Sequence, residues 1–407
     1  MRRGSNLPAV GTYNQTLVLD LIRRAPEGIS RTELAERTGL SAQTLSNVAR
    51  RLVGEGWIVE GTPVAAGPGK PRTPLQLRPA ARCAVGIHLD PAVDTFVVVD
   101  LTGAVIAHSE RTPPQMGTAT DLVADLADAV EELLTAAGVP RERVLGIGVA
   151  APGPFDAERG ALFEPPLLAP AWHHAPLREH LFAATGLPTT VEKDVVAAMV
   201  GELWMDADQE LDDAIFVYYG AGVGMGLAMG GTPLRGRTGN AGDVAHLGVE
   251  RDGPLCECGQ RGCLGAAIAP ERLLVDGGVL RAGAAPTAPE LRAHVDVLTR
   301  RARGGDARAV AAVERVGENL ARAVVQINNL LDADVVVVGG PLWSRLAEAA
   351  RPVLERAVAA SRATATVSGI RLLDSALGTD VAAVGAACLV LDSALTARPA
   401  DLMISSG

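Results

Sequence analysis

The stretch AVVQINNLLDADVVVVGGPLW, residues 323–343, shows the alternation that decides the fold class. Its first part predicts a helix, the four valines at 335–338 predict a buried strand, and the two glycines after them predict a turn. The same alternation occurs upstream, where DLVADLADAVEELLTAAG (121–138) predicts a helix and VLGIGVAAPGPFD (144–156) predicts a buried strand that ends in a Pro/Gly loop. Helices that alternate with buried strands indicate an α/β fold.

A strand–turn–strand pattern occurs twice in this α/β region, near residues 83–108 and near residues 213–234. The second copy contains the glycine-rich turn GAGVGMG at 220–226. Because the two patterns are alike, we expect two similarly built lobes with a cleft between them.

The composition is that of an ordinary soluble globular protein. The chain has 407 residues, of which 48% are hydrophobic and 21% are charged, and this length allows two or three domains. No apolar run reaches the roughly 18–20 residues that a membrane-spanning helix needs, and the N-terminus lacks the apolar segment of a signal peptide. We therefore expect a cytoplasmic protein without a membrane partner.

Charge is unevenly distributed along the chain. Residues 1–80 contain eleven basic and six acidic residues, whereas the whole chain has a net charge of −10. A basic head on an acidic body indicates that the head contacts a polyanion. The alternative is that basic residues cluster there by chance.

The basic head predicts a helix-turn-helix. In TYNQTLVLDLIRRA (12–25), four apolar residues share one helical face: Leu17, Val18, Leu21 and Ile22. SRTELAERTG (30–39) opens with Ser30 and has Glu33 three residues later, which is a capping box at the start of a second helix. Gly39 ends that helix, and a third begins at Ser41 with four residues facing inward: Leu45, Val48, Ala49 and Leu52. Two helices joined by a Gly-containing turn form the DNA-binding unit.

The outward face of the third helix is polar at its start and basic towards its end. Short polar side chains can hydrogen-bond base edges, and arginines can contact phosphates. A solvated helix face is the alternative. The candidate DNA-contacting residues are Ser41, Gln43, Thr44, Ser46, Asn47, Arg50 and Arg51.

The segment after this helix favours DNA binding. GWIVEGTPVAAGPGKPRTPLQLRP (56–79) predicts a strand, a Gly/Pro-rich tip and a second strand, with Lys70 and Arg72 at the tip. This arrangement is a β-wing that places cations near the DNA backbone or minor groove. We therefore predict a winged helix-turn-helix DNA-binding domain over residues 1–80.

The segment HLGVERDGPLCECGQRGC (246–263) holds three of the five cysteines of the chain. Five cysteines do not make a disulfide framework, and clustered thiols in a reducing compartment indicate a metal or catalysis. Zinc prefers four tetrahedral N/S ligands, so we predict a structural Zn²⁺ held by His246, Cys256, Cys258 and Cys263. A redox-active thiol pair and buried unliganded cysteines are the alternatives. The remaining two, Cys83 and Cys388, lie in apolar segments and are predicted core residues.

Several of these stretches together resemble the ROK family, named for its repressors, open reading frames and sugar kinases. They are GIGVAAPGP (146–154), LPTTVEKDVVAAMVGE (187–202), GAGVGMG (220–226), GRTGNAGDVAHLGV (236–249), CECGQRGCL (256–264) and VVVVGGP (335–341). The resemblance implies an actin-like or hexokinase-like body of two α/β lobes that close on a sugar. It places the family zinc site on the same histidine and three cysteines.

This resemblance sets the expected domain boundaries. Residues 81–192 would form the first lobe, with a C-terminal helix at 381–407 packing back onto it. Residues 193–380 would form the second lobe, which carries the zinc site.

The resemblance also shows where the nucleotide site departs from the family kinases. Those kinases bind ATP with an Asp-x-Gly-Gly-Thr turn after the first strand, in which the glycines allow close phosphate approach. The matching stretch here is HLDPA (88–92), with His88 in place of the Asp, and Ala221 stands where the second glycine loop has a Thr. We therefore expect no ATP binding and no kinase activity.

The implied sugar pocket is altered as well. Asp194 matches the catalytic base, Lys193 replaces an Asn, Asp243 replaces a Glu, and Gly265 replaces a second Glu. The candidate ligand-binding residues are Lys193, Asp194, Asn240, Asp243 and His246.

The changes in the pocket indicate a ligand other than plain glucose. A phosphorylated or acidic sugar is one option, because Lys193 would pair with an anion. The alternative is that Lys193 neutralises Glu192 or Asp194 and that the pocket binds no sugar.

These observations predict a sugar-responsive transcriptional regulator, a repressor, that binds operator DNA as a homodimer or homotetramer. Two recognition helices would contact half-sites about one helical turn apart. A sugar or sugar derivative in the cleft would change lobe closure and hence the spacing of the heads. Two alternatives remain open, namely an active sugar kinase with a regulatory head and a zinc-stabilised DNA-binding scaffold without a ligand.

Overall fold

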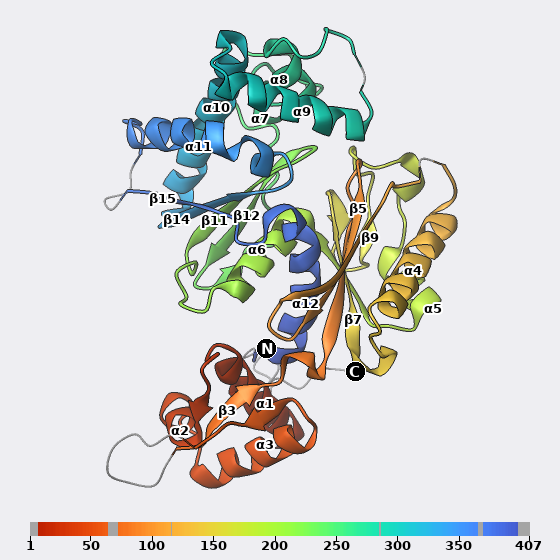
Figure 1. Cartoon of the computed structure of the whole chain (residues 1–407), viewed down its shortest axis with the longest axis vertical. Coiled ribbons are helices and arrows are strands. Elements are labelled where there is room, and N and C mark those ends of the chain that lie inside the picture. The colour runs from red at the N-terminus through yellow and green to blue at the C-terminus, as the bar shows by residue number, and fades with distance from the viewer. Residues whose placement is uncertain (1–6, 64–71, 115, 285, 365–368, 398–407) are drawn as a thin grey trace.

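The N-terminal part of the chain folds as three helices and a small sheet (Figure 1). The computed structural model describes residues 7–63, 72–114, 116–284, 286–364 and 369–397. The elements of the head are α1 (Leu7–Arg23), β1 (Ile29–Ser30), α2 (Arg31–Thr38), α3 (Ala42–Gly54), β2 (Ile58–Glu60) and β3 (Pro74–Leu77). Strand β3 lies between β1 and β2 and pairs antiparallel with both. The predicted helices and the two strands of the wing are therefore confirmed.

The predicted inward faces of α3 and α1 are confirmed for most residues, since Val18 and Ile22 of α1 are buried and Leu21 and Val48 are partly buried against the same core. Leu45, Ala49 and Leu52 of α3 are buried in the core of the head. On α1, Leu19 is buried but Leu17 is only partly buried. The reason is that α1 packs against α2, α3 and β3 of the head and also against a helix of the body, so its apolar surface must serve two neighbours.

The first body sheet contains parallel strands at one side and an antiparallel hairpin at the other. Its strand order is β10-β7-β4-β5-β6. The three parallel strands are β4 (Cys83–His88), β7 (Val144–Ala151) and β10 (Thr189–Lys193), and the two antiparallel ones are β5 (Asp94–Asp100) and β6 (Val105–Arg111). A short 3₁₀ turn at Pro79–Ala81 links the head to this sheet.

The second body sheet repeats this plan. Its order is β13-β12-β11-β14-β15. The parallel strands are β11 (Ala214–Tyr219), β14 (Val335–Gly339) and β15 (Arg371–Asp374), and the antiparallel ones are β12 (Val223–Met229) and β13 (Thr232–Pro233). The repeated pattern confirms two similarly built α/β lobes.

Two helices fill the space between the two sheets, α6 (Asp194–Met205) and α12 (Val381–Leu395) (Figure 1). They pack against each other, α12 contacts β4, β5 and β7, and α6 contacts β11 and β12. One core cluster joins them, since it contains Val97 and Val99 of the first sheet together with Phe216 and Val337 of the second. The predicted C-terminal helix thus begins at Val381 and ends at Leu395, and residues 398–407 lie outside the described residues.

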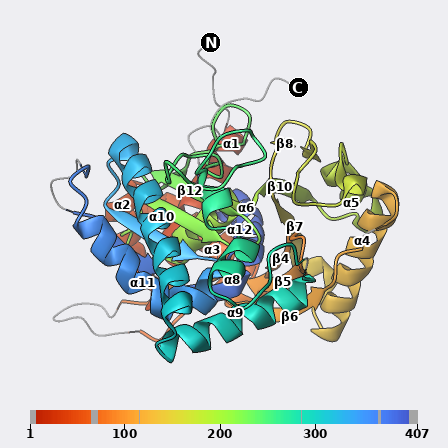
Figure 2. The same cartoon turned by 90° about the horizontal axis from the view of Figure 1, so that it is seen from above.

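Among the other helices, α4 (Ala119–Ala136) and α5 (Leu177–Thr185) cover the outer face of the first sheet, near a small hairpin of β8 (Phe155–Asp156) and β9 (Ala161–Leu162) (Figure 2). The outer face of the second sheet is covered by α10 (Ala307–Leu331) and α11 (Trp343–Ala359), with α7 (Leu264–Ala267), α8 (Pro270–Asp276) and α9 (Ala288–Arg303) packed against α10. Additional 3₁₀ turns lie at Arg141–Arg143, Pro170–Trp172 and Gly378–Asp380.

One stretch of the described chain, Gly378–Leu395, is long and apolar enough to cross a membrane by length and composition. No such stretch was expected from the sequence. In the structure it contains α12, which is packed between the two sheets and against α6. Its apolar character is explained by burial on several sides within the core.

Candidate functional site

Local capping fixes the turn between α2 and α3. Ser30 Oγ accepts a hydrogen bond from the N–H of Glu33, whose carboxylate accepts one from the N–H of Ser30, which completes the predicted capping box. The Glu33 carboxylate also accepts a hydrogen bond from Ser30 Oγ at 2.6 Å, and this bond together with that from the Ser30 N–H lowers the pKa of Glu33. Gly39 ends α2 with a φ of 68°, and Ser41 caps α3 by accepting from the N–H of Thr44 at 3.2 Å.

A polar ridge runs along the exposed face of α3. Gln43, Asn47 and Arg50 are four and then three residues apart, which places them in one row on the helix. Gln43 Nε2 and Arg50 Nη1 both donate to Asn47 Oδ1, at 3.3 and 3.4 Å. The other predicted DNA-contacting residues of this region are exposed or partly exposed: Ser41, Thr44, Ser46 and Arg51.

Two of the predicted DNA-contacting arginines have carboxylate partners. Arg51 Nε donates to Glu55 Oε1 at 2.7 Å, and Arg72 Nη1 donates to Glu33 Oε1 at 3.3 Å. The second pair links the wing, just before β3, to α2. Both pairs are solvent-exposed, so each is weak enough to exchange for a phosphate. Lys70 lies outside the described residues.

The three clustered cysteines and His246 come together around one point. Their donor atoms all lie within 4.8 Å of one another. Cys256 Sγ lies 3.4 Å from His246 Nδ1, and Cys258 Sγ lies 3.6 Å from Cys263 Sγ. A tetrahedral ion with metal–sulfur bonds of about 2.3 Å needs donor atoms roughly 3.8 Å apart. The four residues therefore fit a metal ion, and all three cysteines are free thiols.

The backbone around this cluster is a tight double turn. The N–H of Cys256 donates to Gln260 O, and the N–H of Gly259 donates to Cys256 O. Gly262 has a φ of 71°, and a Cβ there would lie 1.5 Å from Glu250 O. Only glycine allows this approach, which brings Cys263 back beside Cys258.

A cavity of about 400 Å³ lies beside the metal cluster. Its walls include His88, Gly153 and Lys193, which end or follow the parallel strands β4, β7 and β10 of the first sheet. The β11–β12 turn of the second sheet supplies Ala221 and Gly222. Ligands in α/β folds bind beyond the carboxyl ends of parallel strands, which is where this cavity lies.

Four of the five predicted ligand-binding residues line this cavity: Lys193, Asp194, Asp243 and His246. Asn240 is not among the lining residues. Its Nδ2 donates to Phe155 O at 2.8 Å, and its Oδ1 accepts from the N–H of Phe155 at 3.0 Å. Both ends of its amide are therefore used to hold the loop that follows β7.

The charged side chains at and beside the cavity have partners within the protein. Glu192 forms an ion pair with Arg235, and Lys193 Nζ donates to the backbone oxygen of Asn240 at 3.3 Å. Burial raises the pKa of Asp194, although His88 and Lys193 oppose that rise. Asp194 Oδ1 also accepts from the N–H of Val195 at 2.7 Å, at the positive end of α6.

The stretch that matches the nucleotide turn of the family kinases is occupied by side chains. The rings of His88 and Tyr218 meet edge to face, with centroids 6.0 Å apart. A second cavity of about 300 Å³ adjoins the first, and His88, Asp90 and Ala221 line both cavities. His88 and Asp90 thus stand where the two cavities meet.

Tyr218 is a candidate site residue that the sequence analysis missed. It lines the larger cavity, and burial raises the pKa of its phenol well above the usual value. Its buried hydroxyl has no hydrogen-bond partner within the described part of the chain. The available signal was the pair of tyrosines, Tyr218 and Tyr219, which ends the buried stretch before the glycine turn, although the sequence does not say which of the two faces the cavity.

A buried carboxylate next to this site predicts a pH effect on stability. Burial raises the pKa of Asp94 to about 7, and the hydrogen bond from the N–H of Asp90 offsets only part of this rise. The raised pKa means that the folded state binds the extra proton, so stability falls as pH rises from about 4 to 7. The loss between pH 5 and pH 8 is about 2.5 kcal/mol.

Denaturant unfolding at pH 5 and pH 8 checks this effect. Asp94→Asn removes the titrating group, so the difference between the two pH values shrinks by about 2.5 kcal/mol. Asp121→Asn is the control, because hydrogen bonds from Thr118 lower the pKa of that exposed carboxylate and place its titration below pH 4. An Asp94→Asn profile that parallels the wild type would contradict the assignment.

Comparison with known proteins identifies the family. The family model described as the ROK family matches residues 88–393, which is well over half of the chain. The chain belongs to the ROK family. Residues 12–66 of this ROK protein also match the model of the MarR family, which covers the helices and first wing strand of the head.

Two curated relatives differ in how much of this ROK chain they cover. The glucokinase of Thermotoga maritima is 28% identical over 317 residues, which are 75% of this chain and 96% of that protein. The xylose repressor of Bacillus subtilis is 25% identical over 391 residues, which are 94% of this chain and 96% of that protein. The repressor therefore aligns over the head as well as the body.

A solved structure shares the whole architecture. A ROK family transcriptional regulator, described as a homologue of the E. coli MLC protein, has a TM-score of 0.75 and 23% identity and covers 95% of this chain and 98% of its own. At that identity the likeness concerns the fold. It confirms the winged helix-turn-helix joined to a two-lobed ROK body.

Proposed function

We propose that this ROK protein is a transcriptional repressor of sugar metabolism that binds operator DNA with its head. The observation that carries the proposal is the exposed ridge of Gln43, Asn47 and Arg50 on the second helix of a helix-turn-helix. A helix of this kind enters the major groove with its N-terminal residues at the base edges. The full-length similarity to a protein named a xylose repressor supports the same function.

The cavity between the lobes would hold the effector. Asp194 and Asp243 can accept hydrogen bonds from sugar hydroxyls, and Tyr218 Oη can donate or accept. The acidic residues in the cavity wall outnumber its single lysine: Asp90, Asp194, Asp243 and Glu257. This balance favours a neutral sugar over the phosphorylated or acidic sugar considered from the sequence. The full-length relative named a xylose repressor makes D-xylose the first candidate, and D-glucose, against which the altered pocket argues, is the comparison.

Phosphoryl transfer is not part of the proposed function. Asp90 would repel a nucleotide phosphate, and Pro91 replaces a glycine that would allow close approach. The His88 ring, which packs against Tyr218, lines both of the cavities that a sugar and a nucleotide would need to share. Asp194 would then serve as a hydrogen-bond acceptor for the effector rather than as a catalytic base.

The metal cluster would hold a structural Zn²⁺. His246 lies in both the cluster and the cavity wall, so a bound ion would fix one side of the effector site. We further propose that the protein acts in the cytoplasm as a homodimer or homotetramer, with two heads on successive half-sites.

A thermal-shift screen of D-xylose, D-glucose and N-acetyl-D-glucosamine, together with the 6-phosphates of the two hexoses, tests the effector site. We expect a neutral sugar to raise the melting temperature and its phosphate to have less effect. A screen in which no sugar shifts the melting temperature would favour the ligand-independent scaffold instead.

Tyr218→Phe tests the same site at one atom. Its hydroxyl has no protein partner among the described residues, so removing it leaves the free energy of unfolding unchanged or raises it by up to about 1 kcal/mol. Loss of a hydrogen bond to the sugar weakens sugar binding about 10-fold in isothermal titration.

Tyr219→Phe is the matched control for this prediction. Tyr219 Oη donates to Ile268 O at 2.6 Å and does not line the cavity. That variant loses about 1–3 kcal/mol of stability but keeps its sugar affinity. If the two variants behaved alike in sugar binding, Tyr218 would not contact the effector.

A further inference from the structure

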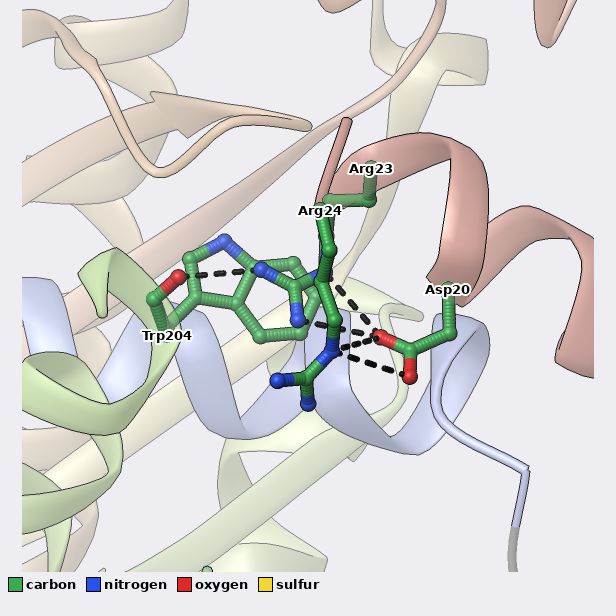
Figure 3. A network of polar contacts seen from close by, with 4 residues as sticks. All are labelled: Asp20, Arg23, Arg24 and Trp204. Carbon is green, nitrogen blue, oxygen red and sulfur yellow. Dashed lines mark hydrogen bonds and ion pairs between the residues drawn. The ribbon is translucent and has the colours of Figure 1, made fainter. Parts of the chain in front are cut away.

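The head is fastened to the body by a buried arginine near the end of α1. The guanidinium carbon of Arg23 lies 3.8 Å from the ring centroid of Trp204, and Arg23 Nη1 donates to Trp204 O at 2.9 Å (Figure 3). Asp20 of the same helix accepts from Nε and Nη2 of Arg23. With a side chain only 7% exposed, this cation is satisfied by a stacked ring, a carbonyl and a carboxylate.

Trp204 is held from both sides. Arg23 covers its ring from the head, and the β5–β6 turn of the body touches its edge, since a Cβ on Gly103 would lie 2.8 Å from Trp204 Cδ1. The indole N–H is buried without a hydrogen-bond partner among the described residues. A buried unpaired donor is costly, so this position of the ring depends on the contacts around it.

An apolar contact lies beside the arginine. Trp57 and Leu77 belong to the head, and both pack against the core cluster that surrounds α6 and α12 as well as against the head's own core. Backbone hydrogen bonds also fix the segment that links the head to the body. The N–H of Arg78 donates to Trp57 O in the head, and the N–H of Leu101 in the body donates to Pro79 O. The head is therefore docked on the body rather than tethered to it.

Helix α6 begins at the effector cavity and ends at the contact between Trp204 and the head. Asp194, the first residue of α6, lines the effector cavity, and Trp204 lies in the last turn of the same helix. Twelve residues of helix span about 17 Å, so α6 connects the two places directly.

α6 is packed so closely against its neighbours that any displacement of this helix must also displace the elements beside it. A Cβ on Gly385 of α12 would lie 1.9 Å from Ala197 O, and a Cβ on Gly226 of β12 would lie 2.2 Å from Val195 O. Backbone thus contacts backbone on two sides of the helix. A displacement at Asp194 cannot be absorbed by side-chain rearrangement along α6.

We propose that α6 carries the state of the cavity to the DNA-binding head, and that Arg23 is the positioning residue that couples the head to the end of this helix. The proposal rests on the proposed function, because it assumes that the head binds DNA and that the cavity controls it. Arg23 contacts neither DNA nor effector in this scheme. Its contact with Trp204 makes the orientation of the DNA-binding helix α3 depend on the position of Trp204.

Arg24 provides a matched control. It is the neighbour of Arg23 in sequence and pairs with the same carboxylate, Asp20, through Nε at 3.2 Å (Figure 3). No contact between Arg24 and Trp204 is seen in the described structure. Arg24→Ala therefore removes a similar charge from the same helix without touching the coupling contact.

The test measures DNA affinity by fluorescence anisotropy on genomic fragments selected with the wild-type protein. Asp194→Asn serves as a perturbation of the cavity that needs no ligand. We expect it to change the Kd for DNA at least 5-fold in the wild-type and Arg24→Ala backgrounds, and less than 2-fold in Arg23→Ala. Arg23→Lys, which keeps the charge but not the planar stack, should restore part of the effect.

The outcomes separate coupling from stability and from the proposed function. A merely structural Arg23 would lower the melting temperature when replaced but leave the effect of Asp194→Asn intact, which would overturn the coupling. An Asp194→Asn effect that is absent in the wild type would overturn it as well. A wild-type protein that selects no DNA would instead overturn the proposed function.

Discussion

Arg50→Ala combined with Arg51→Ala is expected to weaken operator binding about 10- to 100-fold at physiological salt. Both side chains are exposed near the C-terminal end of α3, where cations meet phosphates on either side of the groove. Each lost phosphate contact lowers the slope of log K against log salt by about 0.9, so the double variant loses about 2 from that slope. The reduced slope is the more diagnostic result, because misfolding would abolish binding at every salt concentration.

The two single variants are expected to differ. Among the residues that the structure describes, Arg50 has only an asparagine as partner, whereas Arg51 gives up an ion pair with Glu55 when it binds a phosphate. Arg50→Ala should therefore cost more affinity than Arg51→Ala. The control removes two exposed arginines of the body, Arg281 and Arg362, and should leave both the affinity and the slope unchanged. An unchanged slope in the α3 variant would mean that α3 does not contact DNA.

Cys258→Ser is expected to abolish stoichiometric metal binding and to lower the free energy of unfolding by about 3 kcal/mol or more. Binding to a site that exists only in the folded state adds directly to folding free energy. For a lobe of this size that corresponds to a fall of about 6–12 °C in melting temperature. Cys258 is the exposed member of the cluster, so serine there buries no new polar group. The loss can then be assigned to the metal.

The control for the metal prediction is Cys83→Ala. Cys83 is a buried thiol outside the cluster, and burial raises its pKa to about 11. This variant should keep one zinc per chain by elemental analysis, and treatment with a chelator should lower its melting temperature as much as that of the wild type. Freshly purified wild-type protein that contains no zinc and does not respond to chelator would refute the structural metal.

The features that could be predicted from the sequence are those set by near neighbours. Ser30 and Glu33 are three residues apart, and a helix start of this kind forms from local hydrogen bonds alone. The cysteine cluster is also local, because a tight turn returns Cys263 to Cys258. The strand after α10 was evident from its valines, since a strand buried on both faces needs apolar residues throughout.

The features that could not be predicted depend on distant partners. Asn240 looked like a ligand residue, but its amide is taken by the backbone of Phe155, 85 positions away. Arg23 and Trp204 are 181 positions apart, so no spacing rule links them. The shared core around α6 and α12 is equally non-local, because it arises from two sheets that approach the same pair of helices.

The central claim is that the head binds duplex DNA while the kinase-like body no longer transfers phosphate. One experiment tests both parts. Purified zinc-loaded protein is mixed with sheared genomic DNA and, in a separate assay, with ATP and either D-glucose or D-xylose. The account predicts that the protein selects specific fragments and that no sugar phosphate forms above background. Phosphorylation of a hexose at an enzymatic rate, together with no selected DNA, would contradict it.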